Sequence, residues 1–293
     1  MLMNRTEDKR HSLRQALGVG RVLQFPGAFS ALVATMIERI GFDGVYLSGH
    51  ATAANLALPD ICLTTLTEVV AHTREVARAT SLPVLVDIDT GFGPPTSIAR
   101  AVALVEDAGA AGCQIEDQAS PKRCGQLEGA TLVDADEMVR RIRSAVRGRH
   151  DENFLIIGRT DARTVEGLEA AIDRARAYRK AGADVIFPEA LRDAEEFRAF
   201  RAAVDGPLLI NMTEFGKSPL FGAEEIQALG YSIAIYPISA LRLALYAAEE
   251  GLQSLKAAGD QKALLGRMMK RERLFDYLHY DSYVSFDRDI ERE

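Results

Sequence analysis

Residues 83–118 read PVLVDIDTGFGPPTSIARAVALVEDAGAAGCQIEDQ, and this stretch decides the fold class. It opens with an apolar run rich in valine, PVLVDID, and continues into an amphipathic run, SIARAVALVEDA. An Ala-Gly-Ala triplet closes the helical pattern, and a second apolar run, GCQIED, follows it. This order is typical of a βαβ unit, in which a helix connects two parallel strands.

The same alternation extends over most of the chain. Strands are predicted at residues 21–25, 44–48, 83–89, 112–117, 154–161, 184–189, 207–213 and 232–237. Helical patterns lie between them at residues 66–79, 97–108, 135–146, 168–181 and 193–204, and the letters DADE at 134–137 predict a capping box. Eight strands that alternate with helices predict a (β/α)8 barrel.

No linker or low-complexity tract divides the chain, so we expect a single barrel domain over residues 1–293. The residues from about 258 to 293 exceed what closes a barrel. They are predicted to form a helical extension within that domain, one that packs on a neighbouring subunit.

Composition excludes several classes of function. A formal charge of -7 and a pI near 5.4 argue against a nucleic-acid partner, because such proteins carry basic faces. No apolar signal segment or membrane span is evident, so a cytoplasmic protein without a membrane partner is expected. The three cysteines are widely spaced, which gives no zinc motif.

Polar residues follow most of the predicted strands, where the carboxyl ends of barrel strands form the active face. These residues are Tyr46, Ser48, Gly49, Asp87, Asp89, Glu116, Asp117, Arg159, Asp161, Glu189, Asn211, Thr213, Glu214 and Arg242. Acids, an amide and arginines are therefore expected to converge on one mouth.

Asp87 and Asp89 are two residues apart on a predicted strand, so their side chains should share one face. Two close carboxylates need a cation or a shared proton between them, and a hard divalent metal such as Mg2+ fits. The alternative is that the two acids only end the strand and solvate a loop. The motif alone does not decide between these readings.

The three cysteines receive different interpretations. Cys113 lies inside an apolar strand and is predicted to be core, as is Cys62. Cys124 lies in a long linker, residues 117–133, next to Lys122 and Arg123. Because cations lower the pKa of a thiol, this linker is interpreted as a lid that carries a reactive thiol and suits an anionic substrate. The alternative is a solvated charged loop with an incidental cysteine.

Together these motifs identify a family resemblance over nearly the whole chain. The segments YLSG, LPD, LVDIDTGFG, IEDQ, PKRCG, RTDA, FPEA, NMTEFG and YPISALR resemble, in order and spacing, those of the isocitrate lyase and phosphoenolpyruvate mutase superfamily. Within it, the branch that cleaves 2-methylisocitrate is most similar. The carboxyvinyl-carboxyphosphonate phosphorylmutases and 2,3-dimethylmalate lyases share many of these segments.

The resemblance implies a modified (β/α)8 barrel whose C-terminal helix swaps between subunits of a homotetramer, a dimer of dimers. It implies a lyase with Mg2+, replaceable by Mn2+, that acts on a small di- or tricarboxylate. The expected reaction is retro-aldol (Claisen-like) cleavage of 2-methylisocitrate to pyruvate and succinate in propionate catabolism, the methylcitrate cycle. A degenerate barrel that only binds a dicarboxylate is the non-enzymatic alternative.

Residue by residue, the resemblance assigns three groups of positions. Asp87 and Asp89 match the metal-site acids, with Glu116 around them. Substrate contacts are matched by Ser48, Gly49, Cys124, Gly125, Arg159, Glu189, Asn211, Thr213, Arg242 and Arg271. Further active-site positions, interpreted as catalytic together with Cys124, are matched by Tyr46, Asp60, Lys122 and Arg123. In this chemistry Cys124 is the expected general acid.

Two positions depart from the family pattern. Gln126 stands where the lid of the lyases carries histidine, and His50 stands where they carry glycine. Both are expected to contact substrate. His50 either compensates for the missing imidazole or fills space left by a smaller substrate substituent, and the sequence leaves both readings open.

Overall fold

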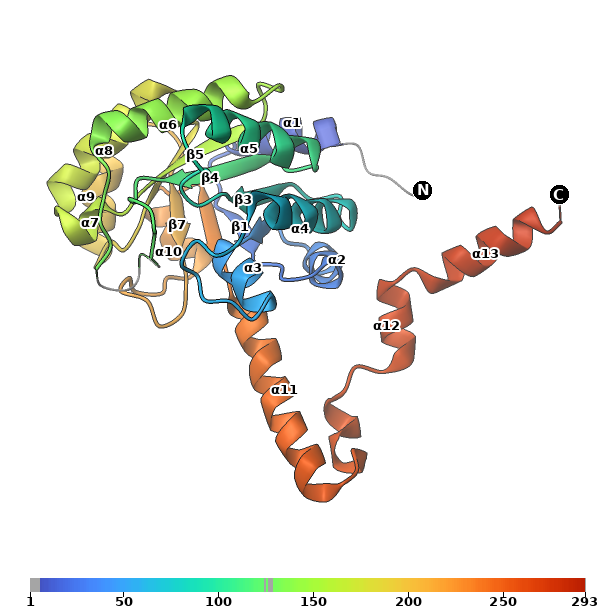
Figure 1. Cartoon of the computed structure of the whole chain (residues 1–293). Coiled ribbons are helices and arrows are strands. Elements are labelled where there is room, and N and C mark those ends of the chain that lie inside the picture. Colours follow the sequence, from blue (N-terminus) through green and yellow to red (C-terminus); the bar gives the residue numbers. More distant parts are fainter. Residues whose placement is uncertain (1–5, 124, 126–128, 293) are drawn as a thin grey trace. The chain divides into compact units, whose positions relative to one another are not determined.

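A computed structural model describes residues 6–123, 125 and 129–292 of the chain. It contains eight parallel strands, which Figure 1 shows surrounded by helices. They are β1 (Leu23–Pro26), β2 (Val45–Leu47), β3 (Val84–Asp87), β4 (Gly112–Glu116), β5 (Leu155–Thr160), β6 (Val185–Pro188), β7 (Leu209–Asn211) and β8 (Ile233–Tyr236). Each lies within one of the eight segments predicted from the sequence, except that β1 extends one residue further.

The strands follow one another around a ring. β2 to β6 pair in chain order, and β1 pairs with β8, which in turn pairs with β7. Single parallel bridges, Gly27 with Tyr46 and Ile186 with Leu208, join the two groups. This order agrees with the predicted (β/α)8 fold.

Helices connect the strands and cover the outside of the ring. They are α1 (Thr6–Ala16), α2 (Ala31–Ile40), α3 (Gly49–Asn55), α4 (Leu66–Arg78), α5 (Pro95–Asp107), α6 (Ala135–Gly148), α7 (Ala162–Val165), α8 (Leu168–Ala181), α9 (Ala194–Ala203) and α10 (Ala223–Ala228). The capping box predicted at the start of α6 is wrong, because Asp134 makes no side-chain cap and Glu137 instead pairs with Arg140 and Arg141. A complete capping box begins α4, formed by Thr65 and Glu68.

Alternation along the strands builds two apolar layers. In β3, Leu85 belongs to the cluster inside the ring, whereas Val84 and Val86 belong to the cluster between the ring and its helices. The inner face of the strands therefore leads from apolar residues at the start to polar residues at the carboxyl end. On β3 the next inward residue after Leu85 is Asp87.

Helix α1 closes the opposite end of the ring. Leu13 packs into the inner cluster, and Lys9 donates hydrogen bonds to the carbonyl oxygens of Ala77, in the last turn of α4, and Thr80, just after it. Arg10 donates to the carbonyls of Glu106 and Ala110 at the end of α5. Both cations thus meet helix carboxyl ends, where carbonyl groups lack partners within the helix.

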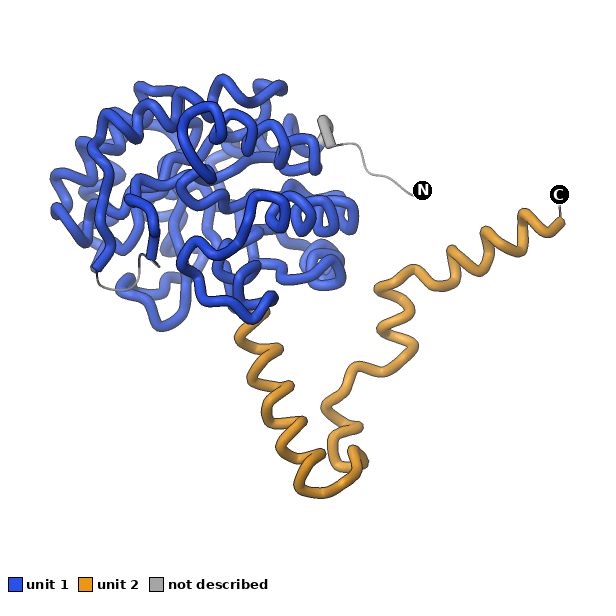
Figure 2. The backbone as a smooth tube through the Cα atoms, viewed as in Figure 1, with its two compact units in different colours: residues 1–239 blue, residues 240–293 orange. Residues whose placement is uncertain are grey.

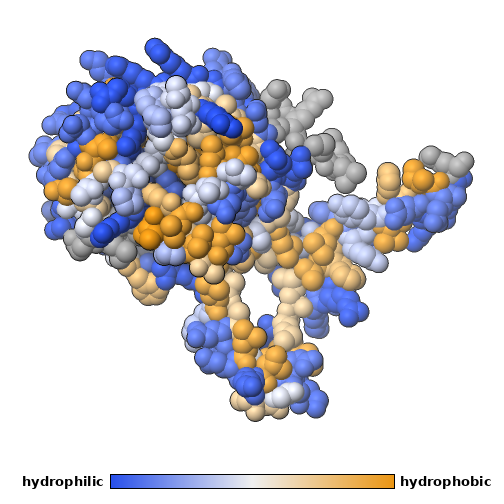
Figure 3. All heavy atoms as spheres, viewed as in Figure 1, coloured by the Kyte–Doolittle hydropathy of each residue, from blue (hydrophilic) through white to orange (hydrophobic). Residues whose placement is uncertain are grey.

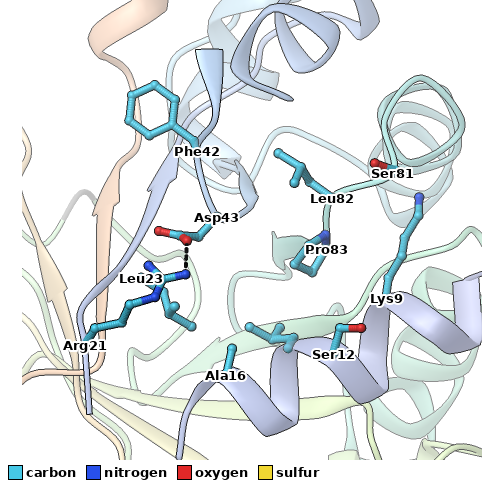
Figure 4. Close-up of a pocket in the computed structure, with 11 residues that line it drawn as sticks. Lys9, Ser12, Ala16, Arg21, Leu23, Phe42, Asp43, Ser81, Leu82 and Pro83 are labelled. Atoms are coloured by element: carbon cyan, nitrogen blue, oxygen red, sulfur yellow. Dashed lines mark hydrogen bonds and ion pairs between the residues drawn. The ribbon is translucent and has the colours of Figure 1, made fainter. Parts of the chain in front are cut away.

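A cavity of about 490 Å³ lies beside α1 (Figure 4). Its walls come from α1 and from residues that precede or begin β1, β2 and β3, and Arg21 is paired with Asp43 at 2.5 Å on its rim. All these segments lie at the amino ends of the strands. The cavity is therefore at the other end of the ring from the polar residues of the predicted mouth.

The chain divides into two compact units, residues 1–239 and 240–293, coloured separately in Figure 2. The second unit holds most of α11 (Ser239–Ala258), a 3-10 helix (Lys262–Arg267), α12 (Arg271–Tyr277) and α13 (Tyr280–Ile290). Large apolar side chains remain exposed on all of them, and Leu243 is 72% exposed. Figure 3 shows apolar surface along these helices. No described helix is long and apolar enough to cross a membrane.

Candidate active site

Acidic side chains crowd the carboxyl ends of β3, β4 and β6. Glu116 and Glu189 are buried, and Asp87 and Asp89 are 6% and 5% exposed. Burial raises the pKa of Glu116 well above its usual value and also raises that of Glu189. Burial likewise raises the pKa of Asp89 to about 6, although the nearby Lys122 acts in the opposite direction. So many buried carboxylates would repel one another and lose their hydration, so the site needs cations to offset that cost.

Asp87 and Asp89 lie side by side, but not because both belong to a strand. β3 ends at Asp87, and Asp89 follows in the left-handed backbone region with φ of 49°. Oδ1 of Asp87 accepts a hydrogen bond from the backbone N of Asp89 (3.0 Å). A methyl group on Gly49 would lie 3.1 Å from Asp87 Oδ2 and 3.2 Å from Asp89 Oδ1. Glycine thus leaves both carboxylates room on the side facing α3.

Lys122 supplies one of the cations. Its Nζ lies 2.7 Å from Asp60 Oδ1 and 2.6 Å from Asp89 Oδ1. Burial alone would lower the pKa of Lys122, but Glu116, Asp89 and the other nearby acids raise it well above its usual value. The sequence interpretation assigned this ammonium to the Cys124 thiol, whereas here it neutralises the acids of the mouth.

Arg159 supplies the second cation. Its Nε and Nη2 donate to the two carboxylate oxygens of Asp161, at 2.9 and 2.8 Å. Nη1 lies 3.3 Å from Glu189 Oε2, and the guanidinium stacks on Phe187, 5.1 Å from the ring centroid. The side-on edge of Arg159 is therefore already used by Asp161. The far end of the guanidinium, where Nη1 lies beside Glu189, points away from Asp161.

The sequence analysis gave no role to Gln114, which organises the acids. The hydroxyl of Tyr46 donates to Gln114 Oε1 (2.5 Å), and Gln114 Nε2 donates to Asp87 Oδ1 (3.1 Å). Gln114 is fully buried in β4, two residues before Glu116. Side chains two residues apart on a strand share a face, so the sequence alone could have placed Gln114 on the inward face with Glu116.

Cys62 was predicted to be core, and that is wrong. It is only half-buried, in the left-handed backbone region with φ of 64°, and its Sγ accepts a hydrogen bond from the backbone N of Lys122 (3.3 Å). Cys113 is fully buried, as predicted. Cys62 therefore belongs to the contacts that hold Lys122 in place.

His50, the second residue of α3, faces Asp60: its Nδ1 lies 3.8 Å from Asp60 Oδ2, and its side chain is 43% exposed. Ser48 caps α3 through its hydroxyl, which accepts from the backbone N of Ala51 (3.4 Å). Asn211 Nδ2 donates to Glu189 Oε2 (3.2 Å). These predicted residues are gathered at the same mouth.

Other predicted residues lie elsewhere or outside the described part. The Arg123 side chain is exposed, and its backbone makes two hydrogen bonds with the side chain of Gln118. Thr213 is half-buried, just after β7. Arg242 and Arg271 belong to the second unit, on α11 and α12. Cys124 and Gln126 lie outside the described residues.

Gly125, between those two, is buried against the Arg159 pair. A methyl group there would overlap Oδ1 of Asp161 and Nη2 of Arg159. The close approach of backbone to the ion pair requires glycine at this position.

Within the described part of the chain, no three Asp, Glu, His or Cys side chains form a ready-made metal site. Mg2+ does not need three, because it keeps waters and takes substrate oxygens alongside one or two carboxylates. Asp87 and Asp89 offer hard oxygen donors on one side, and Glu116 Oε1 is buried without a hydrogen-bond partner. The residues present therefore fit a magnesium ion.

Comparison with known proteins shows which family the chain belongs to. The family model described as phosphoenolpyruvate phosphomutase matches residues 13–256. The chain belongs to this family. A probable 2-methylisocitrate lyase of Corynebacterium glutamicum is 53% identical over 283 residues, which cover 97% of this chain and 92% of that protein. The superfamily predicted from the motifs is thereby confirmed, as is the prediction of an enzyme of the lyase class.

Solved structures of family members agree on the fold. A 2,3-dimethylmalate lyase, described as a member of the PEP mutase/isocitrate lyase superfamily, superposes with a TM-score of 0.90 at 36% identity, over 96% of this chain and 95% of that one. A phosphonopyruvate hydrolase in complex with oxalate and Mg2+ superposes with a TM-score of 0.88 at 28% identity, over 96% and 98%. The fold class predicted from the sequence is confirmed.

Behind α3 lies His72, whose ring supports the start of that helix. Its Nδ1 lies 3.2 Å from Thr52 Oγ1, which in turn donates to the carbonyl of Ser48 (2.9 Å). Nε2 is buried without a hydrogen-bond partner, and burial lowers the pKa of His72. Protonation would thus place a positive charge in the interior, which burial disfavours, although Glu75 and the backbone of Phe29 act in the opposite direction.

We therefore predict that His72 makes the protein acid-sensitive. Because its pKa in the folded state lies below the unfolded value of about 6.5, the unfolded state binds the extra proton, and stability falls as pH drops below 6.5. Urea unfolding between pH 7.5 and 5 should show a smaller loss in His72→Gln than in wild type. His11→Gln, at an exposed histidine, is the control. Equal acid sensitivity in wild type and His72→Gln would contradict the prediction.

Proposed function

We propose that this chain cleaves 2-methylisocitrate to pyruvate and succinate by retro-aldol (Claisen-like) chemistry, with Mg2+ as cofactor. The observation that carries the proposal is the placement of Asp87, Asp89 and Arg159 at one mouth. Two hard carboxylates suit a divalent ion, and the arginine beside them suits a carboxylate of the substrate. The Corynebacterium glutamicum relative with this name supports the choice of substrate.

A bound Mg2+, held by Asp87 and Asp89 with Glu116 nearby, would lower the pKa of the substrate hydroxyl and polarise the forming carbonyl. The chain supplies the carboxylate contacts, for which we propose Arg159, Asn211 and Thr213. The matches of Arg242 and Arg271 to substrate contacts stay predictions. Arg159 presents the end of its guanidinium, since Asp161 holds the other edge.

Cleavage requires one proton to leave and another to arrive. The C2 hydroxyl gives its proton to a carboxylate of the mouth, the carbon–carbon bond breaks, and its electron pair stays on the succinate half. We propose that Cys124 protonates this carbon, since a thiol with a pKa near working pH both donates and recovers a proton. Lys122 keeps Asp60 and Asp89 neutralised during this step.

A second candidate substrate is 2,3-dimethylmalate, because the superposed lyase is named for it. Both substrates carry a hydroxyl that a metal can bind, and both are anionic. His50 lies beside Asp60, where its size can limit the substrate substituent that fits. The other interpretation, in which His50 replaces the missing lid imidazole, is kept beside this one.

Assembly as a homotetramer is also proposed. The second unit buries little of its apolar surface, and Leu243, Tyr246 and Leu252 are each at least 65% exposed. Exposed apolar side chains in such numbers mark an interaction surface. A second copy of the chain, exchanging this unit, would cover them.

The proposed reaction is tested with purified protein and a panel of hydroxy di- and tricarboxylates, with products identified by proton NMR. We expect 2-methylisocitrate with Mg2+ to yield pyruvate and succinate in equal amounts, and chelator to stop the reaction. Faster cleavage of 2,3-dimethylmalate would favour the second candidate. No turnover of any hydroxy acid would contradict the proposed function.

Asp89→Asn should raise the Mg2+ concentration needed for half-maximal rate and lower turnover by about a hundredfold, an effect expected when a metal site is disturbed. The amide carries no charge and is a poorer ligand for a hard cation. Asp173→Asn is the matched control, because that carboxylate is 78% exposed on α8. Full activity of Asp89→Asn in chelator would refute the metal assignment.

Cys124→Ser should lose roughly two to four powers of ten in turnover, the range for one positioned acid or base. A serine hydroxyl has a far higher pKa than a thiol and donates poorly near neutral pH. Substrate affinity, measured by calorimetry, should change little. If the serine variant turned over at the wild-type rate, the thiol would have no part in proton transfer.

A further inference from the structure

Asp117 lies beside Glu116 but faces away from the mouth, toward α8. It is fully buried, and every group that contacts its carboxylate can donate. Thr160 Oγ1 lies at 2.7 Å and the hydroxyl of Tyr178 at 2.8 Å from Oδ2, and the backbone N of Asp161 donates to Oδ1 at 2.9 Å. An ionised carboxylate is an acceptor only, so the three donors fix its position. Burial raises the pKa of Asp117, and the hydrogen bonds from Asp161 N, Thr160 and Tyr178 act in the opposite direction.

Arg174 of α8 provides the balancing charge. Its Nη1 lies 3.6 Å from Asp117 Oδ2 and donates to the Tyr178 hydroxyl (3.2 Å). Glu166 holds the same guanidinium with two hydrogen bonds of 2.7 Å. Residues of α8, a helix on the outside of the ring, therefore hold the Asp117 carboxylate in place.

The two ends of the segment 117–133 meet at the same residue. The backbone N of Val133 donates to the carbonyl of Asp117 (2.9 Å), and Leu132 forms an antiparallel bridge with Gln118. Arg174 Nη1 also donates to the carbonyl of Val133 (2.9 Å). Asp117 and Arg174 therefore fix the point from which the segment leaves and returns.

The hydrogen bond between the Asp117 carboxylate and the backbone N of Asp161 connects Asp117 to a residue of the mouth. Asp161 is 1% exposed, and its two oxygens hold the Nε–Nη2 edge of Arg159. The guanidinium lies over the Phe187 ring, and the two hydrogen bonds to Asp161 fix its orientation. Which N–H groups of Arg159 face the mouth is therefore set by Asp161, and the place of Asp161 is set by Asp117.

We propose that Asp117 is a positioning residue that, through Asp161, orients Arg159 to bind a carboxylate of the substrate. This inference rests on the proposed function only in taking the ligand to be a carboxylate. A positioning role acts on ligand binding in the ground state and the transition state alike, so it should appear in KM more than in kcat.

The test uses Asp117→Asn and Tyr178→Phe in the full-length protein with Mg2+. We expect each to raise KM for 2-methylisocitrate about tenfold while kcat changes less than about threefold. The dissociation constant of oxalate, measured by calorimetry, should rise by the same factor. Oxalate serves as the probe because it was captured with Mg2+ in the phosphonopyruvate hydrolase.

Glu196→Gln is the matched control. Glu196 makes a two-bond pair with Arg163, at 2.7 and 2.5 Å, similar in form to the pair between Glu166 and Arg174 but without contact to Asp117. It should leave KM and oxalate affinity unchanged. In an Arg159→Lys background, Asp117→Asn should add no further loss, because the group it positions is already altered.

The outcomes separate this inference from the proposed function. Unchanged oxalate affinity in both variants overturns the inference, as does an equal loss in Glu196→Gln or a full additional loss in the Arg159→Lys background. Wild-type protein that does not bind oxalate overturns it too. Wild-type protein that binds oxalate but cleaves no hydroxy acid refutes only the proposed function, and oxalate affinity then decides the role of Asp117.

Discussion

The balance of buried charge at the open end of the ring is the constraint on which the site depends. In the part of the chain that the structure describes, Asp87, Asp89, Glu116, Asp161 and Glu189 are buried there with the buried Lys122 and with Arg159, whose side chain is 11% exposed. Burial of a carboxylate is costly and raises its pKa, as it does for Asp89 even beside Lys122. A divalent ion would relieve this excess of acid. The fold therefore concentrates at this end of the ring the acids that would hold the proposed metal.

The barrel meets this constraint with rigid elements. Each inward face begins with apolar residues that pack inside the ring and ends with a polar residue at the mouth, as Leu85 and Asp87 do on β3. The outward face of the same strand ends carries the support, since Asp117 and Thr160 connect to Tyr178 on α8. Because successive side chains of a strand point to opposite faces, one face can contact the ligand while the other face holds the contacting residues in position.

Much of this could be predicted from local sequence. Short apolar runs that alternate with helical patterns located all eight strands, and the polar residues after them located the mouth. Pairings between distant segments could not be predicted that way. Asp161 was recognised at a strand end, but its pairing with Arg159 depends on the turn after β5, where Asp117 holds its backbone. Lys122 was assigned to a thiol two residues away, whereas its long side chain reaches Asp60 and Asp89. Cys62 was predicted to be core. Its contact with the backbone N of Lys122 joins loops 60 residues apart, and no local pattern shows such a contact.

The account depends most on a divalent ion at the acid pair, and anomalous X-ray scattering from crystals grown with Mn2+ measures that directly. Mn2+ takes the oxygen ligands that suit Mg2+ and gives an anomalous signal that Mg2+ lacks. We predict one strong peak at the mouth, within about 2.3 Å of a carboxylate oxygen of Asp87 or Asp89 or joined to both through water. A map without a peak there, with Lys122 still paired to Asp89 at saturating Mn2+, would contradict the account.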